Sequence, residues 1–240
     1  MNKLGIKRTF AYILAIFLIV GILSLIYGVI CFFAEILNNN IKNNVKIENN
    51  VNTEVIDVNF EKENIKKLDI DLNYTDLNIL KGEELKFESS DKSIDIKEEN
   101  NEIKIAEKNI NSKISFGINN KKNTLNIYVP ENMKFENVKI SAGVGTIEIE
   151  NLKTDNLKLE GGVGNIFIKT KVDNMAKIEA GVGKINLNIL NDPKDINLKI
   201  ERGLGQIYFN DNKLEEEQIG DGKVKFEIEG GVGKIEIFNK

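Results

Sequence analysis

The sequence predicts an all-β domain, a β-solenoid or single-stranded β-helix-like repeat, behind one N-terminal transmembrane helix. Two observations predict the solenoid. A Gly-Val-Gly or Gly-Leu-Gly motif recurs five times, and apolar residues alternate with polar ones on both sides of each copy. An uncharged apolar run near the N-terminus predicts the helix. The chain then divides into a cytoplasmic tail (1–9), a transmembrane signal anchor (10–34), a polar tether (35–53) and an extracytoplasmic β-repeat domain (54–240).

The apolar run from Phe10 to Ala34 carries no charge. As a helix it would be about 37 Å long, enough to cross a hydrocarbon core of about 30 Å. Lys3, Lys7 and Arg8 precede it, so the N-terminus is expected in the cytoplasm and the rest outside. A cleaved signal peptide is the alternative, but its apolar core is shorter and ends at a small-residue site. Membrane lipid is therefore an expected partner, and acylation of Cys31 stays open.

The composition excludes several classes of function. The chain has 33 Lys plus Arg against 37 Asp plus Glu, a net charge of −4, so it lacks the basic excess of a nucleic-acid binder. It has no His and one Cys. Histidine-dependent catalysis, a His-bearing zinc site and an intrachain disulfide are thereby excluded. We expect no catalytic residue, cofactor or metal.

Each copy of the glycine motif lies at the centre of two strand-like segments. The step between inward positions is two residues on either side and three across the motif, which indicates a corner or bulge. The motifs follow at spacings of 19, 19, 22 and 28 residues. The corner glycines are Gly143, Gly145, Gly162, Gly164, Gly181, Gly183, Gly203, Gly205, Gly231 and Gly233. We expect the central residues, Val144, Val163, Val182, Leu204 and Val232, to be buried in one column.

A sixth copy is disguised: Leu68 to Ile79 has the same steps, with Asn73-Tyr74-Thr75 in place of the glycine motif. Further strand-like pieces fill the region up to Val129, so residues 54–240 form one continuous β domain. The last copy ends close to Lys240, which leaves no long cap on the stack.

Outward positions also line up between the copies. Stacking at about 4.8 Å would place a row of lysines beside a row of mostly acidic residues. Such rows keep a strand face soluble, and a ligand-binding charged strip is the sharper alternative. The lysines are Lys139, Lys158, Lys177 and Lys199, and the second row is Ser141, Glu160, Glu179 and Glu201.

The glycine motifs do not fit a phosphate or calcium site. A Walker loop needs Gly-Lys-Ser/Thr at the start of a helix, and a Rossmann loop needs a third glycine before a helix, whereas strands follow here. Calcium-binding repeats need an Asp after the glycines, where this chain has residues such as Lys184 and Lys234.

These repeats resemble the bacterial "putative adhesin" domain-of-unknown-function family. The resemblance rests on the Gly-Val-Gly-x-Ile-x-Ile segments and on Lys67-Leu68-Asp69-Ile70-Asp71-Leu72, and it covers about residues 55–240. It implies a β-solenoid-like domain on the extracytoplasmic side of a bacterial cell membrane. Some members are linked to envelope stress, and the family supplies no catalytic residues.

The leading hypothesis is a non-enzymatic, membrane-anchored envelope protein that presents a solenoid surface to an unknown envelope protein or polysaccharide. A self-assembling scaffold, a homo-oligomer built through open strand edges, is the alternative. A carbohydrate-active enzyme would need paired carboxylates, for which Asp69 and Asp71 are the candidates. Arg202 is a candidate binding residue, because the other glycine copies have Ala or Gly at that position. Either it is solvated, or it pairs with a carboxylate.

Overall fold

A computed structural model describes residues 54–56, 65–108, 123–215 and 217–239. All of them belong to a compact unit, Asn52–Lys240. The predicted tail, transmembrane anchor and most of the tether lie outside the described residues. Within the part of the chain that is described, no helix is long and apolar enough to cross a membrane.

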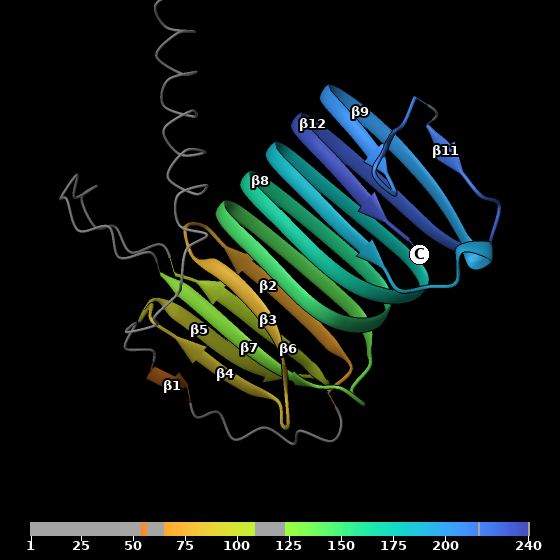
Figure 1. Cartoon of the computed structure of the whole chain (residues 1–240). Helices are drawn as coiled ribbons and strands as arrows, with labels where there is room; N and C mark the ends of the chain where they lie inside the picture. Colours follow the sequence, from red (N-terminus) through yellow and green to blue (C-terminus); the bar gives the residue numbers. More distant parts are fainter. Residues whose placement is uncertain (1–53, 57–64, 109–122, 216, 240) are drawn as a thin grey trace, which may run out of the picture. The chain divides into compact units, whose positions relative to one another are not determined.

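The described part of the domain is all-β, as predicted (Figure 1). A 3-10 turn at Pro193–Asp195 is its one helical element. The strands are β1 (Glu54–Ile56), β2 (Lys67–Leu72), β3 (Asp76–Gly82), β4 (Lys86–Ser89), β5 (Ile94–Glu99), β6 (Glu102–Glu107), β7 (Thr124–Pro130), β8 (Phe135–Ile189), β9 (Ile196–Phe209), β10 (Asn212–Lys213), β11 (Gln218–Ile219) and β12 (Val224–Phe238).

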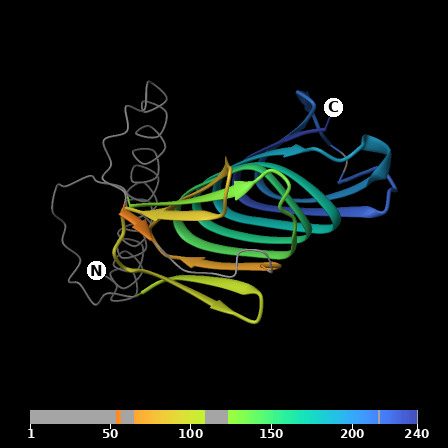
Figure 2. The same cartoon turned by 90° about the horizontal axis from the view of Figure 1, so that it is seen from below.

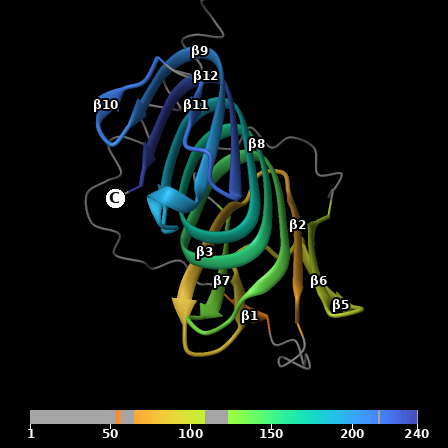
Figure 3. The same ribbon diagram turned by 90° about the vertical axis from the view of Figure 1, so that its right-hand side faces the viewer.

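Strand β8 contains three copies of the repeat in one continuous ribbon of 55 residues. It coils so that each copy forms two arms joined at the glycine motif, and Figure 3 shows the copies as nested U-shaped turns. Alternate residues of both arms point inward: Leu157 and Leu159 before the motif and Ile166 and Ile168 after it are buried. The core therefore lies between the two arms, as the period-two pattern predicts.

The copies do not stack in the order of the sequence. The last strand, β12, is parallel to β8 on one side and to β9 on the other, so the fifth copy lies between the third and the fourth. Phe226 marks the register, because it lies opposite Ala176 of β8 and Leu198 of β9. In Figure 1 β12 accordingly lies between β8 and β9.

The irregular spacings reflect this order. A spacing of 19 residues carries the chain from one copy to the adjacent one within β8. The spacing of 22 includes the 3-10 turn at Pro193–Asp195 and leads to β9, one place beyond the adjacent position. The spacing of 28 includes strands β10 and β11, which pair with the outer edge of β9, and the chain then enters the place between β8 and β9 as β12.

The edge of β9 is partly covered, contrary to the expectation of an uncapped stack. Antiparallel β10 pairs with Tyr208 and Phe209, and antiparallel β11 pairs with Leu198 and Lys199. An antiparallel segment on an edge blocks the addition of a further parallel copy there.

The opposite end of the stack begins with the disguised copy, β2 and β3, which pair in parallel with the first copy of β8. Strands β6 and β7 add in parallel to β2 and β3 respectively. Antiparallel strands then extend the two arms separately. On one arm β5 pairs with β6, and on the other β4 pairs with β7 and β1 pairs with β4. Figure 2 shows the hairpin β5–β6, in yellow-green, apart from the strands of the other arm.

Candidate functional site at the glycine corner

The glycine motifs form a corner at which the backbones of successive copies approach closely. A Cβ atom added to Gly164 would lie 1.7 Å from the carbonyl oxygen of Gly145, and one added to Gly162 would lie 2.3 Å from that of Gly143. Gly164 also has φ +148°, a conformation that residues with a side chain rarely adopt. Both glycines of the motif are therefore needed for stacking, one of them also for its conformation.

The central residues of the motifs are not buried, and their predicted place in the core is wrong. Val144 is 41% exposed, Val232 49% and Leu204 77%. Val163 and Val182 are half-buried. These side chains lie on the outside of the corner.

The physical reason is that the two arms converge at the corner and leave room for one small inward side chain. That place is taken by the residue before the first glycine, Ala142, Gly161, Ala180 or Gly230. A Cβ atom on Gly161 would already lie 2.8 Å from Cδ1 of Ile166, which follows the corner. The Ala or Gly before four of the five motifs is visible in the sequence. It is the signal that could have shown that the central residue of the motif, two positions later, points outward.

The outward residues form a continuous column, which we call the apolar ridge. Along the stack its order is Tyr74, Val144, Val163, Val182, Val232 and Leu204. Val144 joins the disguised copy through its backbone N–H, which donates to the carbonyl oxygen of Asn73 over 2.8 Å. At one end, Tyr74 is 73% exposed. There the Glu107 carboxylate accepts the backbone N–H groups of Asn73 and Tyr74, at 2.7 and 3.0 Å.

A shallow groove of about 500 Å³ runs beside the ridge across four copies. Its floor consists of residues without long side chains, including Gly161, Ala180 and Gly230. Its rim carries one acidic residue from each copy, in the spatial order Glu160, Glu179, Glu229 and Glu201. The groove exists because the close-packed corner requires glycine.

The acidic rim is largely neutralised by the adjacent lysine row, as the sequence predicts for a solvated strand face. Lys158 lies 2.6 Å from Glu160, and Lys199 lies 2.6 Å from Glu201. Lys177 also contacts Glu179. Hydrogen bonding to Lys158 lowers the pKa of Glu160, and hydrogen bonding to Lys199 lowers that of Glu201. None of the described residues forms a cluster of three or more metal-ligating side chains.

Arg202 lies at the end of this groove, on the outermost copy. Its side chain is exposed, and its Nη2 donates to the backbone carbonyl oxygen of Glu215 in the segment that follows β9. The arginine thus contacts a carbonyl group, in place of the carboxylate that a buried position would have required.

The two aspartates considered for catalysis lie on the outer face of β2. Asp69 is in register with Lys104 on one side and Lys139 on the other, and its Oδ1 lies 3.6 Å from Nζ of Lys139. Asp71 is exposed on the same strand. Asp69 therefore extends the charged row of the strand face.

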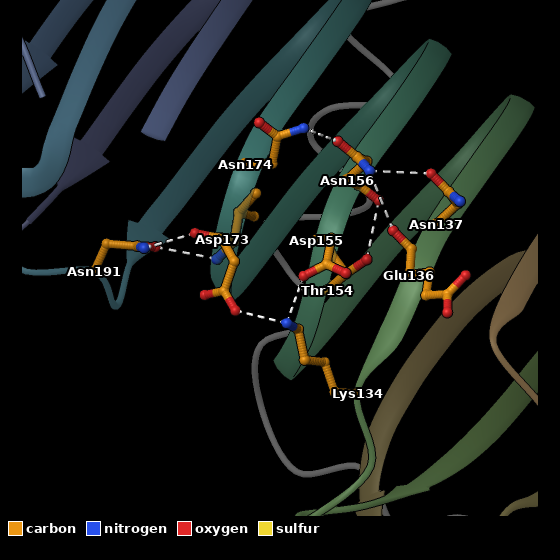
Figure 4. A network of polar contacts seen from close by, with 10 residues as sticks. Lys134, Glu136, Asn137, Thr154, Asp155, Asn156, Asp173, Asn174 and Asn191 are labelled. Atoms are coloured by element: carbon orange, nitrogen blue, oxygen red, sulfur yellow. Dashed lines mark hydrogen bonds and ion pairs between the residues drawn. The ribbon is translucent and has the colours of Figure 1, made fainter. Parts of the chain in front are cut away.

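A second corner, opposite the glycine corner, holds a polar network that sequence reasoning missed (Figure 4). Lys134 pairs with both Asp155 and Asp173, and hydrogen bonds to these two carboxylates raise the pKa of Lys134 to about 12. Buried Asn191 holds the next turn by exchanging two hydrogen bonds with the backbone of Val172, at 2.6 and 3.1 Å. The ion pairs and hydrogen bonds link neighbouring return turns and satisfy buried polar groups there.

Comparisons with known proteins place the chain in a family. A family model described as Toastrack DUF4097 matches residues 65–237, so the chain belongs to this family, and the resemblance found in the sequence is confirmed. No curated protein sequence matches the chain.

Two solved structures are similar. The crystal structure of a "putative cell adhesion protein" from Clostridium sporogenes is 24% identical, with a TM-score of 0.55 over 78% of this chain and 99% of that one. This likeness supports the fold. A "putative adhesin" from Bacteroides fragilis is 13% identical, with a TM-score of 0.32 over 77% of this chain and 97% of that one.

Proposed function

We propose that this Toastrack-family chain is a non-enzymatic, membrane-anchored protein of the bacterial cell envelope that binds an extended polypeptide along its apolar ridge. The observation that carries the proposal is the column of outward apolar side chains from Tyr74 to Leu204, whose two middle members, Val163 and Val182, are half-buried while the others are exposed. Contiguous exposed apolar surface on a folded domain marks interaction sites. An adhesive role, after which the Clostridium sporogenes protein is named, would use the same surface.

The shape and chemistry of the ridge favour a linear polypeptide as partner. Six copies at about 4.8 Å give a line about 24 Å long, which suits an extended chain. Apart from Tyr74, the ridge consists of Val and Leu side chains, which pack against apolar groups and offer no hydrogen bonds to the hydroxyl groups of a glycan. The adjoining glycine-floored groove leaves room for the partner's backbone.

The membrane anchor and the orientation are supported by the sequence: the uncharged segment 10–34 and the preceding Lys3, Lys7 and Arg8. Protease treatment of intact cells, after removal of any outer permeability barrier, tests them. The domain should be digested from outside, and a domain that stays protected would contradict the orientation.

The binding proposal is tested by retention of the full-length chain, in detergent micelles, on a surface coated with gelatin, an extended polypeptide. A variant with Leu204→Lys and Val232→Lys should lose at least about tenfold in retention, because two desolvated charges oppose apolar contact. The matched control is Leu190→Lys, a leucine that is 38% exposed and lies outside the ridge. Equal retention of the ridge variant and the control, or retention on purified cell-wall glycan alone, would contradict the proposal.

A further inference from the structure

The place of β12 between β8 and β9 has the properties of a strand-binding slot. Ile228 lies opposite Ile178 on one wall and Ile200 on the other, and the register is unbroken along both walls except at the motif itself. The two walls are therefore aligned with each other as well as with β12. Any strand with this sequence fits the slot, whichever chain it belongs to.

Three features of β12 match the walls of the slot. Glu227 lies between Lys177 and Lys199. Glu236 pairs with Lys184 of β8 and accepts the Asn186 side-chain amide over 3.2 Å.

The third feature is at the end of the strand. Buried Asn239 donates to the carbonyl oxygens of Ile189 and Asn191, at 3.1 and 2.8 Å. It also exchanges two hydrogen bonds with Asn210. Apart from Asn210, which directly follows β9, the residues that meet β12 here lie outside the connection between β9 and β12.

The connection that keeps β12 in its own chain is long and has little regular pairing. Asn210–Lys223 joins the end of β9 to β12, and its regular pairings are those of the two-residue strands β10 and β11. Exchange of a terminal element through such a hinge preserves every contact of the exchanged strand, so it is a low-cost route to a dimer.

We propose that two copies of this chain associate by exchanging β12, each slot taking the C-terminal strand of the other copy. This inference is independent of the ligand of the apolar ridge. A hinge of this length gives the chain's own strand an effective concentration in the millimolar range, so exchange is favoured where copies are crowded.

Disulfide trapping tests the exchange in the full-length chain in detergent micelles, with Cys31→Ser as background. Met175 of β8 lies opposite Lys225 of β12, so Met175→Cys with Lys225→Cys joins the two strands. An unexchanged molecule gives an intrachain bond, and an exchanged pair gives a covalent dimer on a non-reducing gel. After warming to the onset of unfolding and cooling, the dimer should rise from a minor band at micromolar to the major band at millimolar protein.

The matched control is Lys158→Cys with Lys177→Cys, which joins two copies within the single strand β8 and should give monomer at every concentration. If the first pair impairs folding, Asn197→Cys with Lys225→Cys tests the other wall of the slot. Intrachain bonds alone at every concentration would overturn the proposal. Covalent dimers in equal amount from the control would overturn it too, because collisions at the surface would then explain them.

Discussion

Glu227 of the last strand lies opposite Lys177 of β8. On its other side it lies opposite Lys199 of β9, so one carboxylate separates two lysines that would otherwise be stacked. Glu229, two residues on, is placed in the opposite way, between Glu179 and Glu201. The same strand thus carries one favourable and one unfavourable charge for its slot.

Reversal of these two charges should have opposite effects. Glu227→Lys should lower the melting temperature, because it completes a row of stacked lysines, whereas Glu229→Lys should raise it by relieving a row of glutamates. Both effects should shrink in about 1 M salt, which screens exposed charges. Thermal unfolding followed by circular dichroism measures both; shifts of the same sign would contradict the order of the copies.

Alanine at the second glycine of a motif should be far more harmful than alanine before the motif. Gly164→Ala should cost at least about 3 kcal/mol of unfolding free energy, because the new Cβ atom meets a backbone carbonyl group at φ +148°. Gly161→Ala should cost less than about 1 kcal/mol, since Ala142 and Ala180 occupy the same position and only the mobile end of Ile166 must shift. Denaturant unfolding of the two variants gives the comparison, and equal losses would contradict the close stacking.

Two leucines, one in the second copy of the repeat and one in the fourth, should respond differently to truncation. Leu159→Ala should cost about 2–5 kcal/mol, because Leu159 is fully buried between the arms. Leu204→Ala should change the unfolding free energy by less than about 0.5 kcal/mol, because that side chain is 77% exposed. A large loss at Leu204 would restore the idea of a buried central residue.

Glu236 should make the domain sensitive to acid. Hydrogen bonds from Lys184 and Lys234 lower the pKa of its carboxyl to about 2, from an ordinary value of 4.5. The charged form is favoured in the folded state, so its stabilisation is full above pH 4.5 and is lost as the pH falls towards 2. Glu236→Gln should flatten the dependence of stability on pH in that interval, as measured by denaturant unfolding at a series of pH values. If the pH dependence of the unfolding free energy is the same in the variant, other carboxylates account for the acid sensitivity.

Arg202→Ala should change stability by less than about 0.5 kcal/mol, because the side chain is exposed and water can replace it at the Glu215 carbonyl group. Urea unfolding measures this. A loss of about 3 kcal/mol or more would indicate a desolvated partner of the arginine.

The sequence by itself determined the arms, the core and the corners. Alternation of residues such as Leu157 and Leu159 predicts strands with one buried face, because a strand turns every second side chain to the same side. The repeated glycines predict corners, since only glycine permits the backbone of Gly164 to take its conformation against Gly145. The rows of lysines and acidic residues on the outer face follow from the same alternation of side chains.

Only the tertiary structure decided which way the corner residues face and in what order the copies stack. By its position in the alternating pattern, Val144 should point inward like Ala142. The converging arms leave no room for a second inward side chain after Ala142, so Val144 is exposed. This steric restriction arises only when the two arms pack together. The stacking order depends on contacts between copies that are distant in sequence. Repeats with the same register can pair in any order. The position of β12 is therefore selected by the place of Glu227 between Lys177 and Lys199 and by long-range hydrogen bonds such as that of Asn239 to Asn191. It also needs a hinge long enough to reach back.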